Sequence, residues 1–155
     1  MLAIKICRIY LDMVRNALIV GDFALYSQCM MLPLTLMSPH AHRVVTTEQG
    51  LRDTFHTYLA ALCSQQVTNM IPMAEKAERM AADAITCDYV THALRHGHRV
   101  APPHKSRMTL RHQGGAWRTS AINNAFYNSN LVDPGAPRLT TDLNRPLTIA
   151  PMDLT

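Results

Sequence analysis

The sequence is poor in the residues and runs that would identify several large classes of protein. Of its 155 residues, 6% are aromatic and 17% are charged, and the charged share lies below the roughly one quarter that is usual in soluble domains. Lys5 and Arg8 interrupt the apolar N-terminus, which argues against a membrane span or a signal-peptide core. Hydrophobic residues make up 48%, enough to fill one core. We therefore expect a soluble, cytoplasmic protein with no membrane contact.

Motifs of covalent and cofactor chemistry are missing too. The four cysteines contain no C-x-x-C pair, which argues against a disulfide framework or a zinc cage. No G-x-S-x-G motif is present, and no cysteine stands beside a histidine, so covalent catalysis is disfavoured. The Gly114-Gly115 pair is not followed by G-K-[ST], which argues against a phosphate loop. We expect no cofactor.

The chain has eight histidines, which raises the question of a metal site. His40 and His42, and likewise His96 and His98, have the spacing that places two imidazoles on one face of a strand. A catalytic zinc needs a third ligand, and neighbouring turn residues suggest that both pairs lie at turns. We expect no metal.

Positive charge is concentrated in the second half of the chain. The net charge is +4, and residues 67–126 hold eight Lys or Arg against four Asp or Glu. Single-strand binders usually interleave such a surface with aromatic rings, and here only Tyr89 and Trp117 are near. The pattern favours a solvated basic face of a sheet, with no nucleic acid as partner.

Helices are predicted for the first part of the chain. Apolar residues recur at helical spacing over about residues 3–20, Gly21 can end that helix, and Asp22 can cap the next one, over about 23–30. A third helix is expected to begin with Thr46 as its cap and Gln49 completing a capping box. Its predicted inward face is formed by Leu51, Phe55, Tyr58, Leu59 and Leu62.

Strands are predicted for the rest. Residues 34–37 and 42–46 read as a short hairpin, and Pro72 marks residues 67–77 as an edge strand or a bulge. Residues 74–85 favour a helix by propensity, but β-branched and aromatic residues follow in 85–93, so we predict a hairpin that turns at 79–83. Two further strands, from about 105 and 116, complete a four-strand meander. Helices followed by hairpins indicate an α+β fold with an antiparallel sheet.

Three segments carry a resemblance to a known superfamily. They are Val20-Gly21-Asp22, Thr46 to Leu51, and Gly114-Gly115-Ala116-Trp117-Arg118. In this order of elements the chain resembles the nuclear transport factor 2-like superfamily, and within it the SnoaL-like group. The resemblance implies a cone-shaped half-barrel over residues 1–126, with helices inside the curl of the sheet, a pocket between them, and homodimers formed through the sheet. Residues 127–155, with their prolines, are expected to form an irregular arm.

The superfamily includes ketosteroid isomerases and polyketide cyclases, and the isomerase pattern fails in this chain. Met13 and Ser38 stand where the resemblance would place the isomerase tyrosine and aspartate, and neither residue can do their work. The polyketide cyclases of this superfamily use an acid in the lining of the sheet. The resemblance therefore implies Asp88 and His92 as the candidate catalytic pair.

Asp88 and His92 share one face of a strand, but four residues separate them by about 13 Å, too far for a direct hydrogen bond. In one interpretation, Asp88 pairs with an arginine across the sheet and His92 has no catalytic role. The other makes His92 a general acid or base and Asp88 the orienting carboxylate.

Two functions stay open from the sequence. The first is a protein that binds a small apolar or aromatic ligand. If this protein is an enzyme, its chemistry is proton transfer of the isomerase, cyclase or dehydratase type. Candidate pocket residues are Tyr10, Met13, Phe55, Tyr58 and Trp117. The second is a non-catalytic dimerising scaffold that binds a protein partner. A cavity of several hundred Å³ that exposes Asp88 or His92 would favour the first, and one filled by Met13, Phe55 and Trp117 the second.

Overall fold

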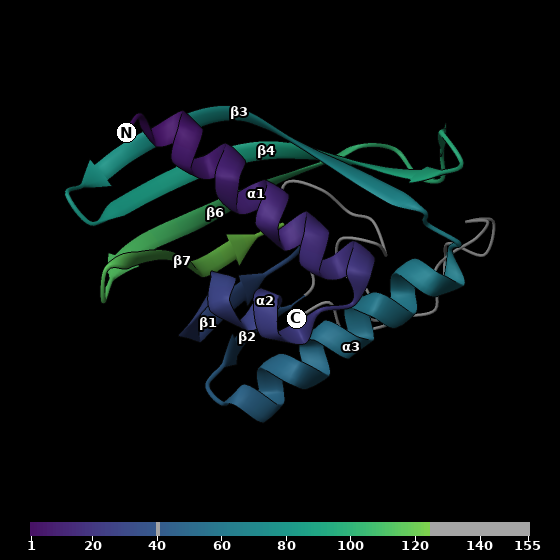
Figure 1. Cartoon of the computed structure of the whole chain (residues 1–155), viewed down its shortest axis with the longest axis horizontal. Coiled ribbons are helices and arrows are strands. Elements are labelled where there is room, and N and C mark those ends of the chain that lie inside the picture. Colours follow the sequence, from purple (N-terminus) through teal and green to yellow (C-terminus); the bar gives the residue numbers. More distant parts are fainter. Residues whose placement is uncertain (40, 125–155) are drawn as a thin grey trace.

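A computed structural model describes residues 1–39 and 41–124 of the chain (Figure 1). It has three helices, α1 (Ala3–Val20), α2 (Phe23–Cys29) and α3 (Glu48–Ser64). Its strands are β1 (Met30–Met37), β2 (His42–Val45), β3 (Asn69–Ala81), β4 (Ala84–Arg95), β5 (His98–Arg99), β6 (His104–Gln113) and β7 (Ala116–Asn123). The predicted arm lies outside the described residues. No helix within residues 1–39 and 41–124 is long and apolar enough to cross a membrane.

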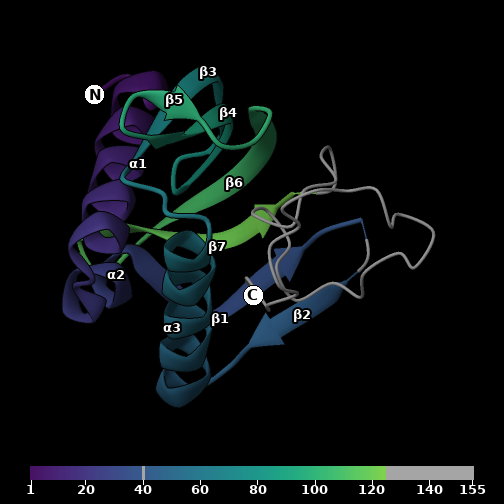
Figure 2. The same cartoon turned by 90° about the vertical axis from the view of Figure 1, so that its right-hand side faces the viewer.

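The strands form one curled sheet in the order β2-β1-β7-β6-β4-β3, with the short β5 paired to β4. Figure 2 shows how the sheet bends around the helices, with α1 and α3 on its inner side. The predicted meander is confirmed, because β3, β4, β6 and β7 follow one another as antiparallel neighbours. The architecture is the predicted α+β half-barrel.

The sheet is mixed, however, and not antiparallel throughout. β1 pairs in parallel with β7, an arrangement that needs a long connection and finds it in α3 and the meander. β1 also begins at Met30, earlier than the expected residue 34, and passes through Pro33. Its register with β7 shifts between Met30 and Thr35, so the residue without an N–H lies where ladder bonding is interrupted.

Helix boundaries follow the predicted signals with one correction. Gly21 adopts a left-handed conformation after α1, and the Asp22 carboxylate accepts a hydrogen bond from the Leu25 amide at 3.1 Å. The cap of α3 is Thr47, which accepts from Gly50 N–H at 3.0 Å, and the predicted Thr46 is wrong by one position. The predicted capping box is also wrong, since the Gln49 amide bonds Asp53 at 2.9 Å.

The segment with conflicting propensities forms a strand. β3 and β4 pair from Asn69 opposite Leu94 to Ala81 opposite Ala84, which confirms the predicted hairpin. Helix-favouring residues are held extended because β4, rich in β-branched residues, offers an inner strand to pair with. Pro72 lies on an edge strand, as predicted.

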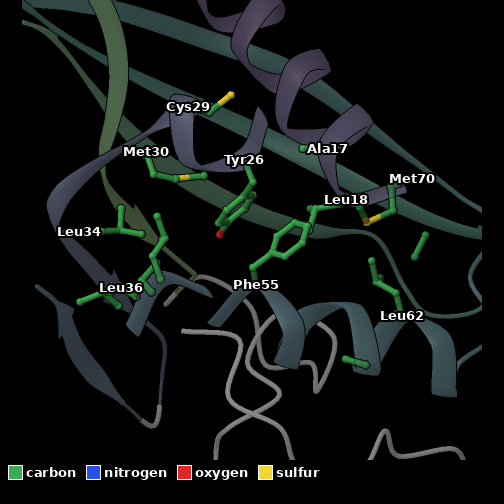
Figure 3. Close-up of a cluster of buried hydrophobic side chains, with 14 residues drawn as sticks. Ala17, Leu18, Tyr26, Cys29, Met30, Leu34, Leu36, Phe55, Leu62 and Met70 are labelled. Atoms are coloured by element: carbon green, nitrogen blue, oxygen red, sulfur yellow. The ribbon is translucent and has the colours of Figure 1, made fainter. Parts of the chain in front are cut away.

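Two clusters of buried side chains form the core. The larger one joins α2, α3 and β1, and in Figure 3 the rings of Tyr26 and Phe55 face each other at its centre, with centroids 4.8 Å apart. The smaller cluster joins the first half of α1 to the inner face of β4 and β6. Helix α1 takes part in both clusters and thereby connects them.

Candidate ligand-binding cavity

A cavity of about 90 Å³ lies where the two core clusters meet. Leu11, from the smaller cluster, and Leu18 and Tyr26, from the larger one, share its wall. The complete lining is Leu11, Val14, Arg15, Leu18, Tyr26, Met30, Leu36, Tyr58, Met70, Pro72, Tyr89, Thr91, His104, Ser106, Ile122 and Asn124. This volume is well below the several hundred Å³ that we expect for a ligand pocket from the sequence. The alternative expectation is a pocket filled by Met13, Phe55 and Trp117. It does not describe this cavity, because none of the three residues lines it.

The polar part of this lining is built by strand register. In β4 and β6, residues that point inward alternate with residues that point outward, and Tyr89 pairs with Ser106 while Thr91 pairs with His104. Directly opposed residues on one face of a sheet have neighbouring side chains. Four hydrogen-bonding side chains are therefore placed together on the inner face of an otherwise apolar wall.

Asn124 completes this group from the end of β7. Its side-chain oxygen accepts a hydrogen bond from Ser106 Oγ at 2.5 Å, and its backbone N–H donates to Met37 O at 2.7 Å. Because Ser106 and Asn124 are both buried, the bond between them is shielded from competing solvent.

Three tyrosines stand around the same space, and all remain neutral phenols at physiological pH. Burial raises the pKa of Tyr58 to about 12, and burial likewise raises the pKa values of Tyr26 and Tyr89. A neutral phenol both donates and accepts hydrogen bonds. The tyrosines therefore add donors to the cavity without adding charge.

His104 is the single imidazole in the lining. It is 6% exposed, and burial, with a smaller contribution from His92, lowers its pKa to about 4. At neutral pH the ring is thus uncharged, with one nitrogen as donor and the other as acceptor. No Asp or Glu lines the cavity within the described part of the chain, so His104 is its only ordinary proton acceptor.

The predicted catalytic pair lies on the other side of the sheet. Asp88 is held by Arg107 through two hydrogen bonds of 2.6 and 3.0 Å, and these bonds keep the pKa of its carboxyl below the usual value. This confirms the interpretation in which Asp88 meets an arginine across the sheet. His92 has the same parity in β4 as Asp88, and neither residue lines the cavity. The prediction that they face the pocket is wrong because it chose the outward parity of the strand.

Of the five predicted pocket residues, Tyr58 lines the cavity. Phe55 is fully buried in the larger cluster, and Met13 packs against that cluster from α1. Tyr10 and Trp117 pack against the smaller cluster, where the indole ring meets His112 at 5.1 Å. Placing these four residues in the pocket is therefore wrong for this cavity.

Sequence reasoning missed Tyr89, Thr91, His104 and Ser106. The signal that could have found them is the period of two in β4, where Ile85 and Cys87 are buried and residues 89 and 91 continue the same face. Within the described ranges, no three His, Cys, Asp or Glu side chains gather as a metal site requires. His96 and Gly97 form a turn with positive φ, and His40 is outside those ranges.

Comparison with known proteins places this geometry in a fold. No family model and no curated protein matches the sequence. Among solved structures, an NTF-2 like protein of unknown function from Shewanella oneidensis MR-1 is similar with a TM-score of 0.62 and 14% identity, over 78% of this chain and 97% of that one. The chain has the nuclear transport factor 2-like fold. This confirms the predicted resemblance at the level of the fold.

Two further structures with this fold differ in what they are called. A putative ketosteroid isomerase from Shewanella frigidimarina NCIMB 400 has a TM-score of 0.56 and 11% identity, over 74% of this chain and 89% of that one. A domain of unknown function with a cystatin-like fold from Nostoc punctiforme PCC 73102 has a TM-score of 0.61 and 6% identity, over 79% and 76%. At such identities the similarity extends to the fold alone.

The burial of His104 predicts a pH dependence of stability. An unfolded histidine takes up its proton near pH 6.5, whereas the folded one does so near pH 4, so the unfolded state gains stability as pH falls through that window. We expect His104 to lower the free energy of unfolding by about 2 kcal/mol between pH 7 and pH 5. Urea unfolding of the parent and His104→Gln at both pH values should show a smaller loss in the variant. His98→Gln, at an exposed position in β5, is the control and should lose as much as the parent. An equal loss in all three proteins would contradict the assignment.

Proposed function

We propose that the protein binds a small, mostly apolar molecule in the cavity under α1, and holds one neutral carbonyl or hydroxyl of it with the polar groups of β4, β6 and Asn124. The observation that carries this proposal is the register that sets Tyr89 beside Ser106 and Thr91 beside His104 within an apolar enclosure. Ligand sites commonly combine such a wall with a few polar groups that fix orientation.

The volume limits the size of the ligand. A cavity of about 150 Å³ holds benzene, so about 90 Å³ accepts about three or four non-hydrogen atoms, either a very small molecule or the end of a longer one such as a four-carbon amide. Of the small apolar or aromatic ligands that the sequence suggested, the volume is too small for those with an aromatic ring. Charge limits its chemistry, because burying a charged group away from a partner is costly, and the inner wall of Tyr89, Ser106 and Asn124 is neutral.

Proton transfer in this cavity would run through His104. Its neutral imidazole can accept a proton from a bound molecule, and the phenols nearby can donate hydrogen bonds to an oxygen on which charge develops. A pKa near 4 makes His104 a weak base, so such chemistry would need a substrate whose own proton is already acidic.

A cavity-filling substitution tests the proposed binding. Val14→Phe directs a ring into the cavity from α1, whereas Val20→Phe adds the same atoms to the exposed end of that helix. Butyramide, a three-carbon chain with a neutral carbonyl, should bind the parent and Val20→Phe and shift the amide NMR signals of residues 89, 106 and 124. It should not bind Val14→Phe. Equal binding by both variants, or shifts centred on Asp88, would refute the cavity as the site.

A second candidate, a homodimer formed through the outer face of the sheet, is supported by one row of residues. Strand register aligns Val44, Thr35, Ala121, Thr109 and Thr86 across five strands. The row is uncharged, and its small or β-branched side chains suit flat packing of one sheet on another. Two copies related by a twofold axis would bring the same row together from both sides.

Sedimentation equilibrium tests this dimer. We expect the parent to be dimeric and Thr109→Arg, which places a charge at the centre of the row, to be monomeric. Thr46→Arg, at an exposed position before α3, should stay dimeric. A monomeric parent, or a Thr109→Arg protein that remains a dimer, would exclude this interface.

A further inference from the structure

Arg15 is the only charged residue among the described residues that line the cavity. It lies on α1, one residue after Val14, and its guanidinium reaches across to the start of β3. There Nε donates to Met70 O at 2.7 Å and one terminal nitrogen donates to Asn69 Oδ1 at 2.8 Å. The side chain is half-buried, so it contributes a positive charge to a place with limited access to water.

Among the described residues, this guanidinium donates to no carboxylate. Its third hydrogen bond goes to the amide oxygen of Asn16, at 3.1 Å. The ion pairs of the described residues join Arg52 to Glu48, Lys76 to Glu78 and Arg107 to Asp88, and Arg15 takes part in none of them. The charge of Arg15 is thus fixed in place by neutral oxygens but is not balanced by a carboxylate within this part of the chain.

The guanidinium of Arg15 has N–H groups left to donate to a ligand. A guanidinium carries five N–H groups, and the three recorded bonds use Nε–H and one N–H on each terminal nitrogen. One N–H on each terminal nitrogen is left for another acceptor. A bond from either of these N–H groups to a carboxylate oxygen is charge-assisted and about twice as strong as a neutral one.

We propose that the natural ligand is a small organic carboxylate whose anionic group binds Arg15 and whose mostly apolar remainder, carrying the neutral carbonyl or hydroxyl, enters the cavity. This inference rests on the proposed function, because it names the class of ligand for the same cavity. A guanidinium also binds phosphate, but Val14, Leu18, Met70 and Pro72 of the same lining are apolar and give an inorganic anion no hydrogen bond in return for its hydration. An apolar body attached to the anion gains from this wall.

The experiment compares matched probes on matched variants. Butyrate, butyramide and butylamine have the same chain and differ in their end group, which is anionic, neutral or cationic. In isothermal titration the parent should bind butyrate at least about tenfold more tightly than butyramide, the gain of one charge-assisted contact. Butylamine should bind weakest, since the cavity offers a cation no acid.

Variants assign the preference to Arg15. In Arg15→Gln the ratio of butyrate to butyramide affinity should fall to near one, and Arg15→Lys should keep part of it. Arg8→Gln removes an exposed positive charge from the same helix and should keep the full ratio. Because the ratio is read within each protein, a general loss of stability does not imitate the result, and thermal melting of each variant verifies that it is folded.

The outcomes separate the two proposals. If butyramide binds and Val14→Phe blocks it, but the parent shows no preference for butyrate or Arg15→Gln retains one, the cavity stands and the carboxylate assignment is wrong. If inorganic phosphate displaces butyrate at lower concentration than butyrate itself binds, the organic carboxylate is likewise excluded. If neither butyrate nor butyramide binds, both proposals fail.

Discussion

The packing of α1 against the inner face of the curled sheet is the interaction on which the rest of this structure depends. Ile6 and Leu11 lie against Ile85 and Leu110 in the smaller cluster, while Leu18 belongs to the larger one. Each such side chain stabilises the fold by about 1.5 to 3 kcal/mol when fully buried. Helix α1, with its 18 residues, spans both clusters, and the cavity lies at their junction.

Strand parity then decides which chemistry meets the cavity. Tyr89 and Thr91 continue the inward series of β4, so their polar groups face the hollow, whereas Asp88 faces outward to Arg107. The separation is physically sensible, since a carboxylate in the apolar enclosure would lose its hydration without a matched partner. Among the described residues, the cavity lining is consequently neutral except at Arg15, where α1 meets the edge strand β3.

Much of the fold could be predicted because its signals are local. The turn at Gly21 and Asp22, the Gly114-Gly115 hairpin and the helical period of α1 each lie within a few residues of sequence. The parallel pairing of β1 with β7 joins segments some 85 residues apart, and no local pattern encodes it. The site was harder still. Assigning it required the parity of β4 and the register of β6, and one residue of error in parity exchanges the two faces of a strand.

A high-resolution crystal structure of the protein as purified, with nothing added, would show whether the cavity exists and holds a ligand. We expect a hollow at the junction of the two clusters, holding density that water alone does not explain, within hydrogen-bond distance of Ser106 or Tyr89 on one side and of Arg15 on the other. A junction closed by side chains, with Tyr89 and His104 packed against α1 and no space between them, would contradict it.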